Sequence, residues 1–500
     1  MNQLKKLAGQ TAVYGLGTIV PRVLNYLLLT PFYTYLFVES KYGVITELYA
    51  YVAFLLVLLT YGMETTYFRF SESEQNKDKV YSNALISVFF TSILFVLFAV
   101  IFRQPLASAI LYPKNPEYIV WLAVIVSLDA VTAIPFAKLR KQNQAGRFVM
   151  IKIVNVVINI VLNLFFFVLC PKLIAENKDS IVAIVYSKKI GVGYAFISNI
   201  VASAISLLIL LPELTKIKLK IDKALLKKML SYTFPLLIVG IAGMVNEVAD
   251  KIFLKYLVTI PETVKDKSAY VLAQIGIYGA NYKIAVLMSI FIQMFRFAAE
   301  PFFFAQAKEK NSNKTYADVM KYFIIFGLLI FLGVMLFMDI FQVFIGPAYR
   351  VGLHIVPIVL LANLFLGISF NLSIWYKLNN MTKYGAVISI LSAIITIILN
   401  IVLIPSYGYT GSAWATFLCY LFMMLFSYFL GQKFYPVKYE IKRIAIYFIV
   451  AIIFYVIHEF LKFNQVFNYI SSFLLMGIFF YLIYYFEIQQ RHIISTNESV

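Results

Sequence analysis

The chain has 500 residues, of which 62% are hydrophobic and only 13% are charged. Soluble domains carry about 25% charged residues, so this composition excludes a soluble protein and indicates a polytopic membrane protein. The net charge of +19 would suggest a nucleic-acid partner for a soluble chain, but most of the lysines lie between apolar runs. The two cysteines lie inside apolar runs, and they predict neither a disulfide framework nor a metal site.

About fourteen apolar segments are long enough to cross a bilayer, which takes about 20 helical residues. The sequence therefore predicts an all-α fold with about fourteen transmembrane helices. The predicted spans are residues 8–37, 42–68, 81–102, 117–137, 147–170, 193–212, 232–256, 274–300, 320–345, 352–376, 384–404, 411–432, 442–461 and 466–486. About twice as many lysines and arginines fall on the side of the N-terminus as on the opposite side, so both termini are expected in the cytoplasm.

The first span is predicted to be a retained helix, because it lacks the small-residue cleavage site of a signal peptide. Arg22 lies about 14 residues into this span, near mid-bilayer at about 1.5 Å per residue. Asn25 shares its helical face, and Pro21 loosens the helix around it. At this depth in the membrane the side chain is too far from the interface to snorkel to it. We therefore interpret Arg22 as a cation that lines a cavity, with Asn25 beside it.

Glu64 and Arg69 lie toward the cytoplasmic end of the second span, where we expect a buried carboxylate and an interfacial arginine. Glu64 is a candidate for a coupling-ion site. In the fourth span, Asp129 has no obvious partner in the sequence.

The fifth span carries a polar stripe in which residues recur at helical spacing. Its members are Lys152, Asn155, Asn159 and Asn163. Asparagine stripes in membranes either join helices or contact a polar substrate, and both interpretations stay open for Asn155 and Asn159.

The middle of the chain divides it into two similar halves. Residues 213–231 carry six lysines and are predicted to form an amphipathic cytoplasmic linker on anionic lipid. Spans five and eleven each hold a central Leu-Asn pair and end in proline, which indicates a repeat of about six spans. The prediction is a six-helix bundle in residues 1–212 and another in 232–433, related by a pseudo-two-fold axis along the membrane normal. Residues 434–500 would add two transmembrane helices and a cytoplasmic tail.

The seventh span holds four polar side chains within two helical turns. Glu247 and Lys251 are spaced i, i+4, as are Asn246 and Asp250. One interpretation is an internal Glu–Lys pair along one helix; the other is a ligand role for Lys251. Glu247 and Asp250 are also candidates for a coupling-ion site.

The eighth span is apolar but contains Lys283, Arg296 and Glu300. A charge within the membrane is costly unless it faces a partner or water. Lys283 shares its face with Gly276 and Gly279, so another backbone or a ligand can approach it closely. We interpret Lys283 and Arg296 as substrate-binding cations and Glu300 as a further candidate for ion coupling.

The sequence gives no sign of catalysis. Each loop is short, and no nucleophile–base pair or metal cluster is visible, so we predict a protein that is not an enzyme and has no cofactor. The three histidines, His354, His458 and His492, have no ligand spacing and predict no metal site.

Four segments carry a resemblance to a known family: residues 61–70, 234–254, 278–305 and 396–416. In these segments the chain resembles bacterial oligosaccharide flippases of the Wzx type, within the multidrug/oligosaccharidyl-lipid/polysaccharide flippase superfamily. The resemblance runs in order from Leu7 to Lys433, and the segment 278–305 is its most specific part. It implies two six-helix bundles around a V-shaped cavity, in the bacterial cytoplasmic (inner) membrane.

The resemblance also implies a substrate, namely a polyprenyl-diphosphate-linked oligosaccharide repeat unit for O-antigen or polysaccharide biosynthesis. The unit would move from the cytoplasmic to the periplasmic leaflet by alternating access, with glycan polymerase or ligase machinery as further partners. By position in the first span, Arg22 is similar to the first-helix arginine of the related lipid II flippases. A diphosphate crossing a membrane needs fixed cations in a wet cavity, which Arg22, Lys251, Lys283 and Arg296 would supply together.

Other functions remain open at this point. A drug/cation antiporter or a lipid II flippase would have the same fold, although an antiporter would favour an anionic or apolar cavity. A membrane-embedded glycan polymerase or ligase is disfavoured, because such enzymes usually have a sizeable periplasmic loop. A rival interpretation is purely structural. In it the four cations form ion pairs with Glu64, Glu247, Asp250 and Glu300, and these pairs only hold helices together.

Overall fold

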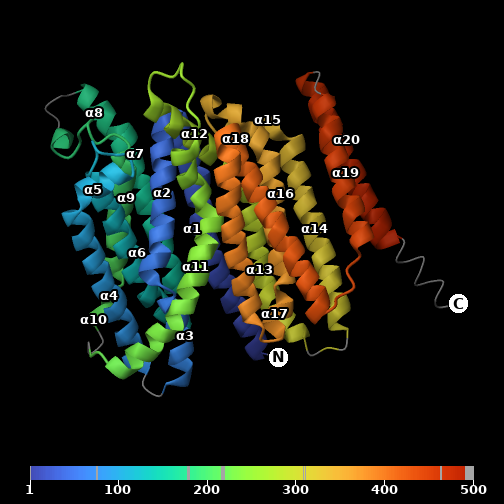
Figure 1. Ribbon diagram of the computed structural model, residues 1–500, viewed down its shortest axis with the longest axis horizontal. Coiled ribbons are helices and arrows are strands. Elements are labelled where there is room, and N and C mark those ends of the chain that lie inside the picture. The colour runs from blue at the N-terminus through green and yellow to red at the C-terminus, as the bar shows by residue number, and fades with distance from the viewer. Residues whose placement is uncertain are drawn as a thin grey trace. The chain divides into compact units, whose positions relative to one another are not determined.

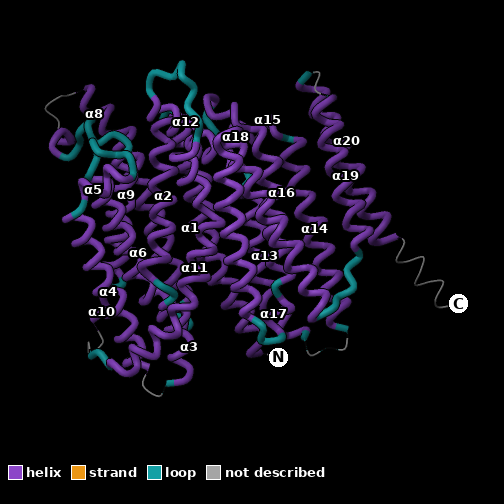
Figure 2. Tube along the Cα trace, in the orientation of Figure 1, coloured by secondary structure: helices purple, strands orange, loops and turns teal. Residues whose placement is uncertain are grey.

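The computed structural model describes residues 2–74, 77–176, 181–215, 220–307, 309, 311–461 and 464–489. Nearly all of the described chain is helical, and no strand occurs in it (Figure 2). Residues 216–219 of the predicted linker, most of the predicted C-terminal tail and His492 lie outside these ranges. Helices suit an apolar chain, because a helix satisfies its backbone hydrogen bonds internally where lipid offers no partners.

Contacts divide the chain into two compact units, and Figure 1 labels the helices of each. Unit 1 comprises residues 1–280 and 383–419, and unit 2 comprises residues 281–382 and 420–500. The helices of unit 1 are α1 (Asn2–Leu36), α2 (Glu39–Thr60), α3 (Met63–Ser73), α4 (Lys77–Ile101), α5 (Arg103–Ala109), α6 (Glu117–Lys141), α7 (Ala145–Leu164), α8 (Cys170–Glu176), α9 (Gly193–Ile209), α10 (Leu211–Thr215), α11 (Lys223–Leu257), most of α12 (Lys267–Ile284) and the first part of α18 (Thr382–Phe434).

Unit 2 takes the end of α12 and the second part of α18. Its other helices are α13 (Val286–Gln306), α14 (Ser312–Leu336), α15 (Met338–Phe341), α16 (Val356–Leu372), α17 (Ile374–Leu378), α19 (Ile441–Phe460) and α20 (Gln465–Tyr484). A short 3-10 segment, Pro347–Ile355, leads into α16.

Eleven helical stretches of the described chain are long and apolar enough to cross a membrane. The chain is therefore a multi-pass membrane protein with an all-α fold, as predicted, while the count of fourteen spans stays a prediction. Helix α9, over the predicted sixth span, is apolar but shorter than these eleven.

One of the predicted spans was wrong. The predicted span 274–300 is not one helix, because α12 ends at Ile284 and α13 begins at Val286. The predicted spans 384–404 and 411–432 are two helices, as expected, because α18 is divided by a kink at Gly408, whose φ of 54° is left-handed. Pro405 and Gly408 together turn the chain there, because proline lacks a donor and glycine tolerates positive φ.

Unit 1 is closely packed where α12 crosses α2. A Cβ atom on Gly276 would overlap the backbone carbonyl of Glu39, and one on Gly43 would overlap that of Leu272. Only glycine permits two backbones to approach this closely. Next to this crossing, α2 also packs on α11, so the three helices form one framework.

A buried ion pair links α2 and α11. Lys255 Nζ lies 2.9 Å from Glu47 Oε2, and the side chains are 5% and 0% exposed. The Tyr112 hydroxyl donates to the same carboxylate at 2.6 Å, and its ring lies under the ammonium of Lys255. Two partners therefore compensate a charge that would be very costly alone in this interior.

Unit 2 is held at one end by an ionic cluster on the last two predicted spans. Lys321 of α14 is fully buried and lies 2.7 Å from Glu440 and 2.9 Å from Glu487. Arg443 of α19 is 3.1 Å from Glu440. The cluster ties the C-terminal helix to α14 and α19, which also pack on each other.

Candidate functional site

Arg22 lies in the middle of α1 and remains accessible. Its side chain is 41% exposed, and it forms an ion pair with Glu247 of α11 at 3.9 Å, whose side chain is 56% exposed. Arg22 Nε also donates to the Tyr26 hydroxyl at 3.1 Å. Charges this exposed in the middle of membrane helices must face water or a polar ligand, because lipid would not solvate them.

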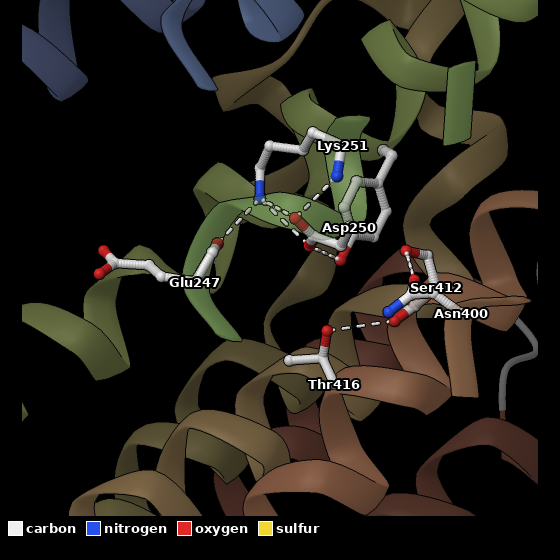
Figure 3. Close-up of polar contacts among 7 residues, drawn as sticks. Glu247, Asp250, Lys251, Asn400, Ser412 and Thr416 are labelled. Carbon is white, nitrogen blue, oxygen red and sulfur yellow. Dashed lines mark hydrogen bonds and ion pairs between the residues drawn. The ribbon is translucent and has the colours of Figure 1, made fainter. Parts of the chain in front are cut away.

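One turn further along α11, Lys251 pairs with the adjacent Asp250. Its Nζ lies 2.8 Å and 3.1 Å from the two carboxylate oxygens, and it also contacts the backbone carbonyl of Glu247 at 3.4 Å (Figure 3). The Tyr278 hydroxyl of α12 donates to Asp250 at 2.6 Å. Two interpretations were open for Lys251, and its ion pair is with Asp250 and not with Glu247, whose carboxylate lies 3.9 Å from Arg22.

Below these charges lies a neutral network. Asn246 accepts a hydrogen bond from Thr396 at 2.8 Å, and Asn400 accepts one from Ser412 at 2.9 Å. Figure 3 shows the hydrogen bond between Ser412 and Asn400. The network joins α11 to both sides of the Gly408 interruption in α18, so it fixes the helix that carries the charged groups.

Asn25 behaves differently from the amides of the fifth predicted span. Its Oδ1 is buried without a hydrogen-bond partner in the described chain. Asn155, in contrast, donates to Ser206 of α9 at 3.0 Å, and Asn159 accepts from Asn163 at 3.1 Å. Both of the latter amides are used in contacts within unit 1, as helix-joining residues would be.

Asp129, which had no partner in the sequence, accepts a hydrogen bond from Ser203 of α9 at 2.8 Å. Glu64 forms an ion pair with Arg140 of α6. Both carboxylates thus find their partners on helices that are distant in sequence, and this is why the sequence did not reveal them.

Lys283 is half-buried near the end of α12. The glycines on its face were expected to admit either a backbone or a ligand. Gly276 packs against the backbone of α2, and a Cβ on Gly279 would collide with the Thr46 side chain. The space beside these glycines is therefore filled by α2.

Unit 2 contains a second polar region, a narrow groove with a free volume of about 20 Å³. Arg296 of α13 lies over the Phe370 ring at 4.0 Å, and Glu300 pairs with Lys377 of α17 at 2.7 Å. The groove is lined by Phe295, Arg296, Ala299, Glu300, Phe303, Phe370, Asn371, Ser373, Ile374 and Lys377. Among the described residues, Arg296 has no carboxylate within ion-pair distance, so the cation faces the groove.

The sequence missed three features of these regions. Glu47 and Lys255 are 208 positions apart and pair only in the fold. Lys377 follows a predicted span, and Asn371 is one of many asparagines, so neither stood out. The one feature of the sequence that could have indicated this pair is the position of Glu47 inside an apolar span. Across the described residues, no group of three His, Cys, Asp or Glu side chains could hold a metal ion.

The fold is that of a known class of membrane proteins. The lipid II flippase MurJ in an inward closed conformation matches with a TM-score of 0.68 and 15% identity, over 94% of this chain and 98% of MurJ. An inward-facing multidrug resistance MATE family transporter of the MOP superfamily matches with a TM-score of 0.62 and 12% identity, over 85% and 94% of the two chains. A Vibrio cholerae MATE transporter gives 0.52 and 11%, over 86% and 96%.

Sequence comparison then places the chain more narrowly. Residues 7–306 match the family described as polysaccharide biosynthesis protein, and the chain belongs to this family. A comparison with curated proteins finds no match. This family agrees with the resemblance predicted from the four segments, while the Wzx type stays a prediction.

Proposed function

We propose that the protein is a flippase that moves a polyprenyl-diphosphate-linked oligosaccharide from the cytoplasmic to the periplasmic leaflet of the inner membrane. The family concerns polysaccharide biosynthesis, and a lipid II flippase has a similar fold. The observation that carries the proposal is the exposure of Arg22 in the middle of α1. A diphosphate is the kind of ligand that such a guanidinium binds, through two parallel charge-assisted hydrogen bonds.

Arg22 is the principal phosphate contact in this proposal, with Lys251 beside it on α11 and Asn25 one turn further along α1 as a further contact. Lys283 and Arg296 would act on the same substrate at other stages of its passage. Asn155 and Asn159 are retained as minor contacts only, since their amides already bond within unit 1.

The carboxylates predicted for ion coupling are all ion-paired in this state. Glu247 neighbours Arg22, Asp250 pairs with Lys251, Glu64 with Arg140 and Glu300 with Lys377. We propose that Glu247 is the relevant one, because it exchanges its contact with Arg22 when the diphosphate arrives. Alternating access between two bundles, with both termini in the cytoplasm, completes the cycle. The lysines near 213–231 would lie on anionic lipid, and a glycan polymerase or ligase would receive the product.

Cells test this proposal directly. When the chain is depleted, the lipid-linked repeat unit should accumulate on the cytoplasmic face, and surface polysaccharide should fall. Arg22→Gln should fail to complement, whereas Arg69→Gln should complement, because Arg69 lies over the Tyr232 ring away from the Arg22 cluster. Normal export by Arg22→Gln at equal protein levels would reject the assignment.

A drug/cation antiporter is the second candidate, favoured by the MATE-like fold. An antiporter would extrude cationic dyes from loaded cells and leave the lipid-linked glycan unaffected. Dye extrusion without any glycan phenotype would replace the flippase proposal.

A further inference from the structure

Unit 1 is closed where α2 meets α11 and α12. This contact lies at the end of α1 away from the N-terminus, because α2 begins three residues after α1 ends. Helix α2 belongs to the first predicted bundle, whereas α11 and α12 belong to the second. Cβ atoms on Gly43 and Gly276 would overlap the facing backbone, so these helices leave no room between them for a polar head group.

The buried pair of Glu47 and Lys255 joins α2 to α11 at the same end of unit 1. Lys255 lies two turns beyond Glu247, which is about 12 Å along α11. The same helix therefore carries the contact with Arg22 and the closed end. Under the proposed function, a substrate bound at Arg22 leaves toward the periplasm past this contact, so α2 must separate from α11 and α12 there.

The closed pair contains an unsatisfied atom. Both Lys255 and Tyr112 donate to Oε2 of Glu47, at 2.9 Å and 2.6 Å. The other oxygen, Oε1, is buried and has no hydrogen-bond partner in the part of the chain that the structure describes. Desolvation of a buried ion pair can cost more than the attraction returns, and an unpaired oxygen adds to that cost. Both costs disappear when the pair becomes hydrated.

Two tyrosines beside the pair are also polar contacts between α2 and α11 or its neighbour. The hydroxyls of Tyr51 and Tyr256 lie 3.2 Å apart, and Tyr256 donates to the Ala109 carbonyl at 3.5 Å. Hydroxyls exchange protein partners for water at little net cost, whereas separated apolar surfaces lose the free energy of burial. The polar contacts therefore make separation of these helices less costly than an apolar contact would.

We propose that the Glu47–Lys255 pair is the latch of a gate between α2 and α11, and that its buried charges lower the free energy of opening. In the closed state the pair fixes the two helices against each other. In the open state both charges gain water. The proposal rests on the proposed function for the cargo and for the direction of release.

An apolar latch tests the effect of the charges. The variant Glu47→Met/Lys255→Met is reconstituted as the full chain with a fluorescent polyprenyl-diphosphate-linked oligosaccharide. It should melt no lower than the parent, because apolar residues replace the pair without leaving a lone charge. Flipping should be slower by about tenfold or more, because opening now exposes apolar surface and recovers no hydration of charge. Flipping at the parental rate, or a lower melting temperature, would overturn the role of the pair.

A disulfide tests whether the contact must open. A Cβ on Gly279 of α12 would lie 3.2 Å from that of Thr46 on α2, near the separation of about 3.5–4.5 Å in a disulfide. Thr46→Cys/Gly279→Cys is made in a chain whose two buried cysteines, Cys170 and Cys419, are replaced by alanine. Oxidation should reduce flipping to the level of protein-free liposomes, and dithiothreitol should restore it.

Gly17→Cys/Val149→Cys is the matched control. Its two Cβ atoms would also lie 3.2 Å apart, but the disulfide joins α1 to α7 within the first predicted bundle and should leave flipping unchanged. Undiminished flipping with the oxidised α2–α12 disulfide, or an equal loss with the α1–α7 disulfide, would overturn the gate. If the chain extrudes a cationic dye and flips no glycan, a block of dye extrusion by the α2–α12 disulfide refutes the flippase and leaves the gate standing.

Discussion

Replacing Arg22 by glutamine separates a substrate-binding cation from a structural one. Arg22 and Glu247 are 3.9 Å apart and about half-exposed, and ion pairs of this kind contribute about 0.2–1 kcal/mol. Arg22→Gln should therefore lower the melting temperature by at most about 4 °C. Transport should fall much further, by about tenfold or more, because a charge-assisted contact with the diphosphate is lost.

The two quantities are measured on the same purified protein, stability by thermal unfolding in detergent and transport after reconstitution. Lys255→Met is the control, since it breaks a buried pair on the same helix and should cost about 3–5 kcal/mol of stability. If Arg22→Gln melts as low as Lys255→Met, and Arg22→Gln/Glu247→Gln restores both stability and transport, then Arg22 only holds helices together and the reasoning fails.

Three further predictions concern the framework around the site. Combining Glu47→Gln with Lys255→Met should recover most of the stability that either change loses alone, because no buried charge is left uncompensated; additive losses in thermal unfolding would contradict this. Gly276→Ala should abolish the folded, monodisperse protein in size-exclusion chromatography, since its Cβ meets backbone on α2, whereas Gly243→Ala on α11 meets nothing within 4 Å and should be tolerated. Burial raises the pKa of the Glu213 carboxyl, but hydrogen bonds from Lys138 and Arg147 outweigh this effect and hold the pKa below its ordinary value. The stability from this carboxylate is present at neutral pH and lost as the pH falls below about 4. Below that pH the melting temperature of Glu213→Gln should therefore change less with pH than that of the parent protein. Equal slopes of melting temperature against pH for the two proteins would refute this prediction.

Hydropathy was enough to predict the class of fold. Apolar runs of about 20 residues can only be satisfied as helices in lipid, and eleven stretches of the described chain fulfil this. One boundary was harder, because the junction at Ala285 interrupts a helix without interrupting the apolar run. The break at Gly408 was predicted, because Pro405 and Gly408 separate two apolar runs there.

A residue of the candidate site could be predicted only where its charge is energetically costly inside the membrane. Arg22 stood out because an arginine is expensive at mid-bilayer, and its side chain is exposed there. Lys251 was recognised as a site residue, but its partner was not. The side-chain rotamer of Lys251 decides whether it pairs with Glu247 or with Asp250, and the sequence does not predict that rotamer. The unpaired Oε1 of Glu47 could not be recognised at all, because what marks it is the absence of a hydrogen-bond partner in the described fold.

The central claim is tested most directly by flipping in a purified system. The full chain is reconstituted into proteoliposomes that contain a fluorescent polyprenyl-diphosphate-linked oligosaccharide, and a membrane-impermeant reagent that modifies the glycan reports how much of it faces outward. The account predicts that the protected fraction becomes accessible when the protein is present, and that Arg22→Gln slows this by about tenfold or more. Accessibility that is equal in liposomes with and without the protein, under each imposed ion gradient, would contradict it.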